Sequence, residues 1–304
     1  MQGTSNHHIQ TDSSEPEKMQ KKGSSVGLRW LTALILMPVA VLIAWFGGWV
    51  AFAVVLLAVV VGILELNAMF VHAGYHPTVW VSFLVCALFL IAAMFPEQRT
   101  IITDVGLSAG LFLSVICLFF RKSLEGALID WALTLAMPVY LGWSASFFLL
   151  LRGSEVGILH PASGAWLYVP SGVWWLLVAL LGVWGFDSAA FFAGRYFGRH
   201  KLIPMISPAK TWEGVIGGLV FSVIAALLIT VVPLHVPWYL AVVLGIVIGI
   251  AATIGDLAES VIKRQTGVKD SGQVLPGHGG VLDRIDSLLF VVIVVYLFAQ
   301  LFPK

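Results

Sequence analysis

The sequence predicts an all-α membrane protein: a bundle of about nine transmembrane helices with its N-terminus in the cytoplasm. Of the 304 residues, 59% are hydrophobic and only 11% are charged, whereas soluble domains are about 45–50% apolar and about 25% charged. Apolar runs of about 20 residues, the length that crosses a bilayer, also recur along the whole chain. A bilayer solvates apolar side chains over most of a protein's surface, so this composition favours a membrane protein.

The apolar runs divide into nine predicted spans. Gly47 and Gly48 separate the first two, and this boundary is the weakest of the set. The last span begins with a charged first turn. The spans are Leu28–Phe46, Trp49–Phe70, Val79–Phe95, Ile101–Phe120, Ala127–Leu151, Val173–Phe192, Gly214–Val232, Trp238–Ile254 and Val281–Phe302.

Three regions follow from this division. Residues 1–27 are polar and mixed in charge, which predicts a disordered cytoplasmic tail. Residues 28–172 hold the N-terminal membrane helices, and residues 173–304 form a C-terminal membrane region that carries the polar chemistry. The net charge of +1 argues against a nucleic-acid partner. Cys86 and Cys117 lie in apolar runs and indicate small hydrophobic residues.

Lysine and arginine set the predicted orientation, because cytoplasmic loops of membrane proteins are enriched in both. With a cytoplasmic N-terminus and nine spans, 14 of the 17 basic residues fall on the cytoplasmic side. Only Arg99, Arg152 and Lys304 fall on the far side. The polar motifs of the C-terminal region then all face the cytoplasm, where nucleoside triphosphates are found.

Carboxylates near the cytoplasmic ends of the last two spans predict a metal site. Asp283 and Asp286 are three residues apart at the start of the ninth span and therefore share a helix face. Asp256 ends the eighth span at a similar depth, so we expect the three side chains to converge. Mg²⁺ binds carboxylate and phosphate oxygens, and charged residues inside membranes are usually functional. The alternative is a set of helix caps and ion pairs, with Asp283 or Asp286 against Arg284.

Basic side chains and glycines surround these carboxylates. Such groups, with the glycine-rich turn at residues 277–280, suit a polyphosphate. The basic residues alone could instead be orientation signals that contact lipid head groups. No Walker A motif is present. The candidate ligands of a phosphate are Ser207, Lys210, Thr211, Lys263, Arg264, Lys269 and His278.

Glu65 is the one charged residue well inside an N-terminal span. It is predicted either to make an interior hydrogen bond or to line the wall of an active-site cavity. The sequence favours neither interpretation.

The C-terminal motif resembles a known enzyme family. Residues 260–286 read SVIKRQTGVKDSGQVLPGHGGVLDRID, which resembles the signature of the CDP-diacylglycerol synthases, also called phosphatidate cytidylyltransferases. The upstream block is similar to the same family, with Asp187 followed by Gly194-Arg195, Gly198-Arg199 and the segment SPAKTWEG at residues 207–214. The resemblance covers residues 184–287, and the N-terminal helices match only as apolar spans.

The resemblance implies an enzyme of phospholipid biosynthesis in the bacterial inner membrane. The reaction would be CTP + phosphatidate → CDP-diacylglycerol + pyrophosphate in a homodimer with a cytoplasmic active site. It would depend on Mg²⁺, and the resemblance leaves a second cation open. By motif position, Asp256 and Asp283 would bind the metal, and Lys263 and Asp286 would complete the catalytic set. The substrate-binding residues would be Asp187, Ser207, Lys210, Thr211, Ser260, Arg264, Lys269, His278 and Arg284.

Two alternatives remain open at this point. A related membrane CTP-dependent transferase, of the CDP-archaeol synthase or polyprenol kinase type, could use a similar nucleotide pocket on another lipid acceptor. A transporter or channel could use the buried carboxylates as ion sites, but it would be expected to show internal repeats. The polar motifs here crowd into one half of the chain.

Overall fold

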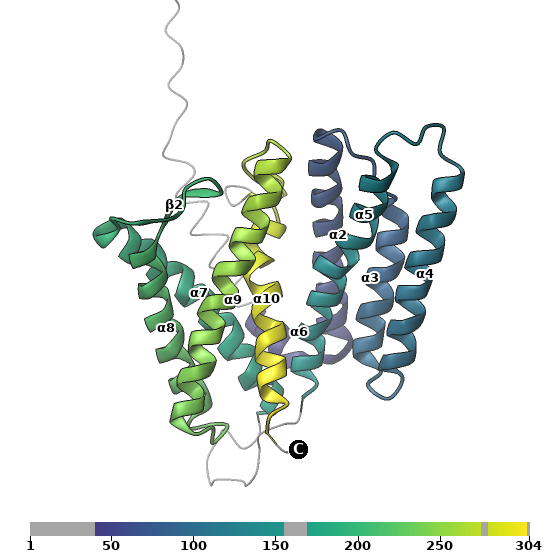
Figure 1. Ribbon diagram of the computed structural model, residues 1–304. Coiled ribbons are helices and arrows are strands. Elements are labelled where there is room, and N and C mark those ends of the chain that lie inside the picture. The colour runs from purple at the N-terminus through teal and green to yellow at the C-terminus, as the bar shows by residue number, and fades with distance from the viewer. Residues whose placement is uncertain (1–39, 155–168, 275–278, 303–304) are drawn as a thin grey trace, which may run out of the picture.

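The computed structural model describes residues 40–154, 169–274 and 279–302. In this part of the chain, long helices run up and down along one common direction (Figure 1). Residues 40–46 are helical up to a break at Gly47, and α2 begins at Gly48. The remaining helices are α3 (Val79–Met94), α4 (Arg99–Phe119), α5 (Ala127–Met137), α6 (Ser144–Arg152), α7 (Ser171–Phe197), α8 (Trp212–Thr230), α9 (Trp238–Gln265) and α10 (Leu282–Ala299), with α2 spanning Gly48–His72.

The predicted spans from the second to the ninth each correspond to a helix or a helical unit. The fifth is a continuous helical unit in which α5 and α6 are joined by the π-helix η1 (Pro138–Trp143). Pro138 has no N–H to donate to the preceding turn, so the hydrogen-bond ladder shifts at this residue. The predicted beginning of the first span and the predicted tail lie outside the described residues.

The predicted end of the eighth span was wrong. We expected Asp256 to end the span after Ile254, but α9 continues to Gln265, so Asp256 lies inside the helix. Hydropathy falls at Asp256 because the last turns of α9 carry charged side chains. Asp256 and Lys263 form ion pairs with Lys210 of β2 and Asp283 of α10, so the helix continues where its apolar pattern stops.

A short hairpin is the one departure from the predicted all-α fold among the described residues. Strands β1 (Lys201–Ile203) and β2 (Ser207–Thr211) pair antiparallel between α7 and α8. A turn closes the hairpin through the bond from the Ile206 N–H to the Ile203 carbonyl, and Trp212 N–H binds the carbonyl of His200. The hairpin carries the SPAKT segment, which we had expected only to lie near the cytoplasmic end of a helix.

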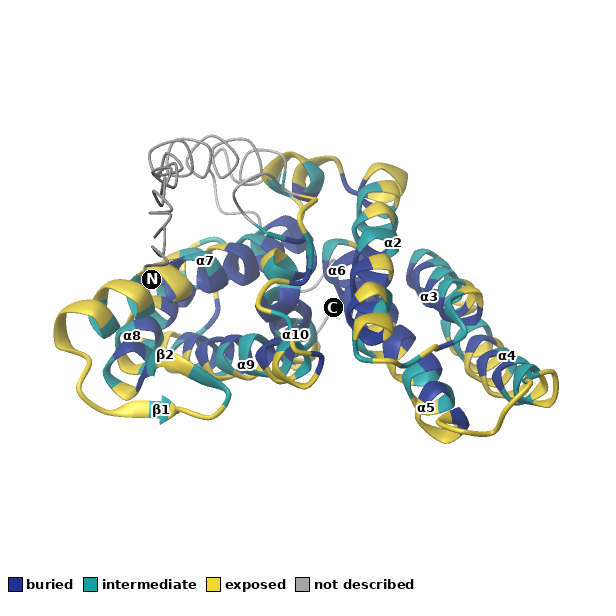
Figure 2. Ribbon diagram, turned by 90° about the horizontal axis from the view of Figure 1, so that it is seen from above, coloured by how far each residue is buried: buried dark blue, intermediate teal, exposed yellow. Residues whose placement is uncertain are grey.

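The helices form two groups when seen from above (Figure 2). Helices α7, α8, α9 and α10 pack against one another, and α10 also contacts α6 and α2 in the other group. Glycine allows close approach between helices: a Cβ on Gly245 of α9 would lie 2.4 Å from the backbone of Val223 on α8. Trp175, Leu176 and Ile248 are fully buried in the core of this group.

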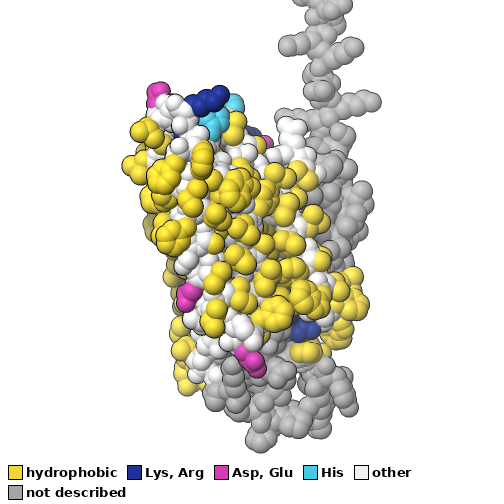
Figure 3. Space-filling view, turned by 90° about the vertical axis from the view of Figure 1, so that its right-hand side faces the viewer, with side chains coloured by type: hydrophobic (Ala, Val, Ile, Leu, Met, Phe, Trp, Pro, Cys, Tyr) yellow, Lys and Arg dark blue, Asp and Glu magenta, His cyan; other side chains and the backbone are white. Residues whose placement is uncertain are grey.

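Within the described part of the chain, six helical segments are long and apolar enough to cross a membrane: α2, α4, the unit Ala127–Arg152, α7, α8 and α9. Helix α3 is apolar but shorter, with 16 residues. Hydrophobic side chains cover most of the described surface in the view of Figure 3. Large apolar residues such as Phe112 and Leu228 are 67% and 71% exposed, which a bilayer tolerates and water does not. The fold is that of an integral membrane protein.

Candidate active site

Charged side chains from four elements gather at one end of the α7–α10 group. They come from the C-terminal half of α7, from β2, from the last turns of α9 and from the first turns of α10. Figure 1 shows the hairpin, the end of α9 and the start of α10 at this same end of the bundle. We call these residues the carboxylate–lysine cluster: Asp187, Lys210, Asp256, Glu259, Lys263, Asp283 and Asp286.

Lys263 joins α9 to α10. Its Nζ lies 2.6 Å from Oε2 of Glu259, one turn earlier on α9, and 2.7 Å from Oδ1 of Asp283 on α10. The side chains of Glu259, Asp283 and Lys263 are 1%, 8% and 15% exposed. A buried lysine between two carboxylates has both partners needed to offset the loss of its hydration.

Lys210 brings the hairpin to the cluster by an ion pair with Asp256 of α9. Other contacts hold β2 in position. Arg264 Nε donates to the carbonyl of Ile206 at 3.2 Å, and Thr211 Oγ1 accepts the N–H of Gly214 at 3.2 Å as the N-cap of α8. The Lys210 and Asp256 side chains are 22% and 36% exposed, so this part of the cluster is open to solvent.

The cluster contains more negative than positive charge. Asp187, Asp256 and Asp286 lie close enough to interact electrostatically with one another, and Asp187 also interacts with Lys210 and Arg284. Five carboxylates therefore face two lysines and one arginine. Oε1 of Glu259 is buried and has no hydrogen-bond partner among the described residues. Such a set of oxygens suits a cation.

Asp283 is held by the loop before α10 as well as by Lys263. Its Oδ2 accepts the backbone N–H groups of Ser271 at 3.0 Å and Gly280 at 2.9 Å, and the hydroxyl of Ser271 at 2.9 Å. Both oxygens of Asp283 thus have protein partners. The predicted alternative of a capping and ion-paired carboxylate describes these contacts, although the partner is Lys263 rather than Arg284.

Glu65 reaches the same loop from α2. It accepts the N–H of Val281 at 2.9 Å and the N–H of Leu282 at 2.8 Å, and its carboxylate is buried. The sequence left open an interior hydrogen bond or a place at the site for Glu65. The structure shows interior hydrogen bonds, and they are made to the backbone next to Asp283. We had expected the amides of the glycine-rich turn at residues 277–280 to bind a polyphosphate. The amide of Gly280 binds Asp283, and the two amides that follow the turn, those of Val281 and Leu282, bind Glu65.

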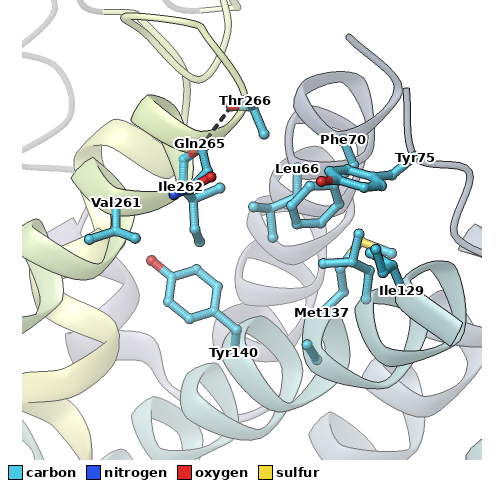
Figure 4. A pocket seen from close by; sticks show the side chains of 12 residues that line it. Leu66, Phe70, Tyr75, Ile129, Met137, Tyr140, Val261, Ile262, Gln265 and Thr266 are labelled. Carbon is cyan, nitrogen blue, oxygen red and sulfur yellow. Dashed lines mark hydrogen bonds between the residues drawn. The ribbon is translucent and has the colours of Figure 1, made fainter. Parts of the chain in front are cut away.

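An apolar pocket lies beside the cluster, between α2, the α5–η1 segment and α9 (Figure 4). Its volume is about 410 Å³, within the range of about 300–1,000 Å³ that is usual for ligand pockets. The hydroxyl of Tyr140 points toward α9 in this view and has no hydrogen-bond partner among the described residues. Tyr140 interacts electrostatically with Asp256, Glu259 and Asp286, so it stands between the pocket and the cluster.

The predicted site residues divide into two sets. The structure brings together Asp187, Lys210, Asp256, Lys263, Asp283, Arg284 and Asp286. Arg264 and Thr211 hold the hairpin and cap α8, Ser207 lies in β2, Ser260 is buried on α9, and Lys269 is exposed after α9. His278 lies outside the described residues.

Sequence reasoning missed three residues that the structure places here: Glu259, Ser271 and Tyr140. Glu259 had a visible signal, because Asp256, Glu259 and Lys263 are spaced at three and four residues and so share a helix face. That signal was lost when the predicted helix ended at Ile254. Ser271 and Tyr140 carry no comparable pattern.

Across residues 40–154, 169–274 and 279–302, no three His, Cys, Asp or Glu side chains form a group that could hold a metal ion. Three of the five carboxylates of the cluster, Asp256, Glu259 and Asp283, are instead paired with lysines. The donor set still fits a hard cation, because it is rich in oxygen, carries excess negative charge and includes the unpartnered Oε1 of Glu259.

The fold and the cluster define a polytopic helical membrane protein with a charged, oxygen-rich site at one end of the bundle. Comparison with known proteins specifies the family. The family model of the cytidylyltransferases matches residues 27–302, and the chain belongs to this family.

Three similar proteins agree with this assignment. The phosphatidate cytidylyltransferase of Brucella suis biovar 1 (strain 1330) is 34% identical over 285 residues, which cover 92% of this chain and 96% of that protein. The protein of the same name from Haemophilus influenzae is 48% identical over 191 residues, or 56% of this chain and 66% of that protein. The one from Staphylococcus epidermidis (strain ATCC 12228) is 33% identical over 269 residues, or 87% of this chain and 95% of that protein.

Proposed function

We propose that this chain is a phosphatidate cytidylyltransferase, which converts CTP and phosphatidate into CDP-diacylglycerol and pyrophosphate. The observation that carries the proposal is the carboxylate–lysine cluster at one end of a membrane bundle. The cluster combines oxygen ligands for a cation with lysines for phosphate, and an apolar pocket adjoins it. Membership of the cytidylyltransferase family and the names of the similar proteins support the nucleotide and the lipid acceptor.

The proposed topology has nine spans, a cytoplasmic N-terminus and a cytoplasmic active site in the bacterial inner membrane. The arrangement of the basic residues supports it. Lys210 and Lys263 lie at the end of the bundle where α4 joins α5 through Arg121, whereas Arg99 begins α4 at the other end (Figure 1). Cytoplasmic loops are enriched in such residues. The proposal retains the three regions 1–27, 28–172 and 173–304 and a homodimer.

The proposed chemistry is an in-line displacement at phosphorus. A phosphate oxygen of phosphatidate attacks the α-phosphorus of CTP, a new P–O bond forms, and the bond to the β-phosphate oxygen breaks as pyrophosphate leaves. A phosphate monoester is already ionised near neutral pH, so little general-base catalysis is required. The protein's part is positioning and charge neutralisation, for which Lys210 and Lys263 are placed at the cluster.

Mg²⁺ is the proposed cofactor, and the same donor set could also hold a second cation. A bound Mg²⁺ would neutralise charge on the reacting phosphates and orient them. Asp256 and Asp283 would hold it, with Asp286 beside them. In the structure these two carboxylates are paired with Lys210 and Lys263. A bound cation would complement the carboxylates, and a phosphate would complement the ammonium groups.

The remaining predicted binding residues surround this centre. Ser207 lies on the hairpin with Lys210, Ser260 lies on α9 with Asp256, and Arg284 interacts with Asp187. These positions support binding of CTP on the solvent-exposed side of the cluster. Thr211, Arg264, Lys269 and His278 complete the proposed set.

The apolar pocket supports a lipid acceptor. Its walls carry hydrophobic side chains, and two of the lining residues, Ile129 and Val261, are exposed at the surface. An acyl chain of phosphatidate in the pocket would leave the head group near Tyr140 and the cluster. The buried Tyr140 hydroxyl would then find a phosphate or ester oxygen as its hydrogen-bond partner.

The proposal is tested with purified protein, radiolabelled CTP, Mg²⁺ and a panel of lipid acceptors. Phosphatidate should give a labelled product that is soluble in chloroform, and Asp283→Asn should abolish it while the protein remains monodisperse in detergent. Activity only with an archaeal ether lipid or with a polyprenol would favour one of the related transferases. Near-normal turnover by Asp283→Asn would contradict the role of Asp283 as a ligand.

A further inference from the structure

Glu65 is a buried carboxylate on α2, distant in sequence from the rest of the site, and its side chain is 5% exposed. We propose that Glu65 is a positioning residue of the active site, which fixes Asp283 by holding the backbone before α10. This inference rests on the proposed function. It gives the N-terminal helices a part in the reaction, since Glu65 does not touch the substrates in this arrangement but acts through Asp283.

The first step is the capping of α10. Oε1 of Glu65 accepts the N–H of Val281, and Oε2 accepts the N–H of Leu282. The first four N–H groups of a helix have no partner within the helix, and α10 has no side-chain cap at its own N-cap residue, Val281. A carboxylate at this end is also favoured by the helix dipole. Glu65 therefore performs, from another helix, the work of an N-cap.

The second step is the link to Asp283. The N–H groups of three consecutive residues, 280, 281 and 282, bind Asp283, Glu65 and Glu65 in turn. The hydroxyl of Ser271 lies 2.9 Å from Oδ2 of Asp283 and 3.3 Å from Oε2 of Glu65. Because the two carboxylates share one short backbone segment and one hydroxyl, a change at Glu65 displaces the donors that orient Asp283.

Two glycines show how closely the loop surrounds Glu65. A Cβ at Gly272 or at Gly280 would lie 2.7 Å from Oε1 of Glu65, closer than side chains approach one another. The approach is possible only because both positions lack a side chain. Glycine would not be needed at positions 272 and 280 if Glu65 made no close contact with the loop. The two glycines of the loop therefore leave the space that the carboxylate of Glu65 occupies.

The test compares two buried carboxylates of the N-terminal half. Glu65→Gln keeps the volume of the side chain but places an amide NH₂, a donor, against a backbone N–H. The control is Asp130→Asn on α5, since Asp130 is 4% exposed, pairs with Arg121 at 2.6 Å and accepts the N–H of His76, all away from the cluster. Both variants lose a buried acceptor, and only one of them adjoins Asp283.

Two quantities are measured: kcat with saturating CTP and phosphatidate, and the rise in unfolding temperature on adding Mg²⁺ and CTP. Glu65→Gln is expected to lower kcat about 10- to 100-fold, as changes next to a ligand do, and to reduce the rise in unfolding temperature. Asp130→Asn is expected to lower the unfolding temperature without ligand and to keep wild-type kcat and the wild-type rise. Wild-type kcat and rise in Glu65→Gln would overturn the proposal.

A second variant keeps the test decisive if Glu65→Gln does not fold. Gly272→Ala pushes a methyl group toward Oε1 of Glu65 and should reproduce both effects. A folded Gly272→Ala protein with unchanged kcat and nucleotide response would likewise overturn the positioning role. Wild-type protein that responds to CTP but forms no lipid product would contradict the proposed function instead, and the rise in unfolding temperature would still report on Glu65.

Discussion

The ammonium group of Lys263 lies 2.7 Å from Oδ1 of Asp283 and joins the end of α9 to the start of α10. The same nitrogen binds Glu259, whose other oxygen is buried without a partner among the described residues. One lysine thus balances two carboxylates in a site that excludes most of the solvent. We expect both stability and the proposed activity to depend on this contact, and mutation can separate the two effects.

Lys263→Met should abolish activity and destabilise the protein. Removing one partner of a buried ion pair typically costs about 3–5 kcal/mol, because the remaining charge is left uncompensated. In the Lys263→Met background, Glu259→Gln should restore part of the unfolding free energy but none of the activity. Unfolding in detergent and turnover of radiolabelled CTP measure the two effects. An unchanged unfolding free energy in Lys263→Met would show that Lys263 does not stabilise the protein by compensating the charge of these carboxylates.

Lys210→Met should behave differently, because the Lys210–Asp256 pair is partly exposed. Exposed pairs contribute about 0–1 kcal/mol, so the unfolding free energy should change little. The rate should fall on the order of 10²–10³-fold, the cost of losing one charge-stabilising group in a transition state. Lys210→Arg, which keeps the charge, serves as the matched control. If Lys210→Met raises KM for phosphatidate and leaves kcat and KM for CTP unchanged, Lys210 binds the lipid rather than the nucleotide.

The contrast between these two lysines shows what the sequence could and could not predict. Apolar runs located the membrane helices, since burial in lipid leaves a strong signal in composition. The position of Asp256 was predicted at the end of a helix, although α9 extends to Gln265, because charged side chains paired across helices look like a helix end in a hydropathy pattern. The Lys263–Glu259 spacing was visible but lay beyond that predicted end.

Contacts between distant segments explain the other differences. Glu65 and Leu282 are separated by 217 positions, and no local pattern reports that the carboxylate of one binds the amide of the other. The hairpin at residues 201–211 was missed because its strands are only three and five residues long and its stability comes from neighbours such as Arg264. The motif nevertheless identified Lys210 as a candidate site residue, and the structure adds its partner, Asp256.

Thr211→Val should distinguish a structural role from a binding role. Thr211 Oγ1 accepts the N–H of Gly214 and caps α8, and loss of such a cap costs about 1 kcal/mol. Thr211→Ser retains the hydroxyl and should have wild-type stability. If the hydroxyl serves only as a cap, KM for CTP is unchanged in Thr211→Val at a temperature where the variant is folded. A rise in KM for CTP in Thr211→Val but not in Thr211→Ser would show that the hydroxyl also contacts the nucleotide.

The apolar pocket leads to a prediction about the lipid chain. Ala136 lines the pocket, so Ala136→Trp should reduce the space for an acyl chain and raise KM for long-chain phosphatidate, while KM for CTP stays the same. Leu128 lies on the same helix, is 72% exposed and does not line the pocket, so Leu128→Trp is the matched control and should behave like wild type. A short-chain phosphatidate, which needs less of the pocket, should show a smaller difference between the two variants. Equal KM values for long-chain phosphatidate in both variants would mean that the acyl chain binds elsewhere, because only Ala136→Trp changes the volume beside Tyr140.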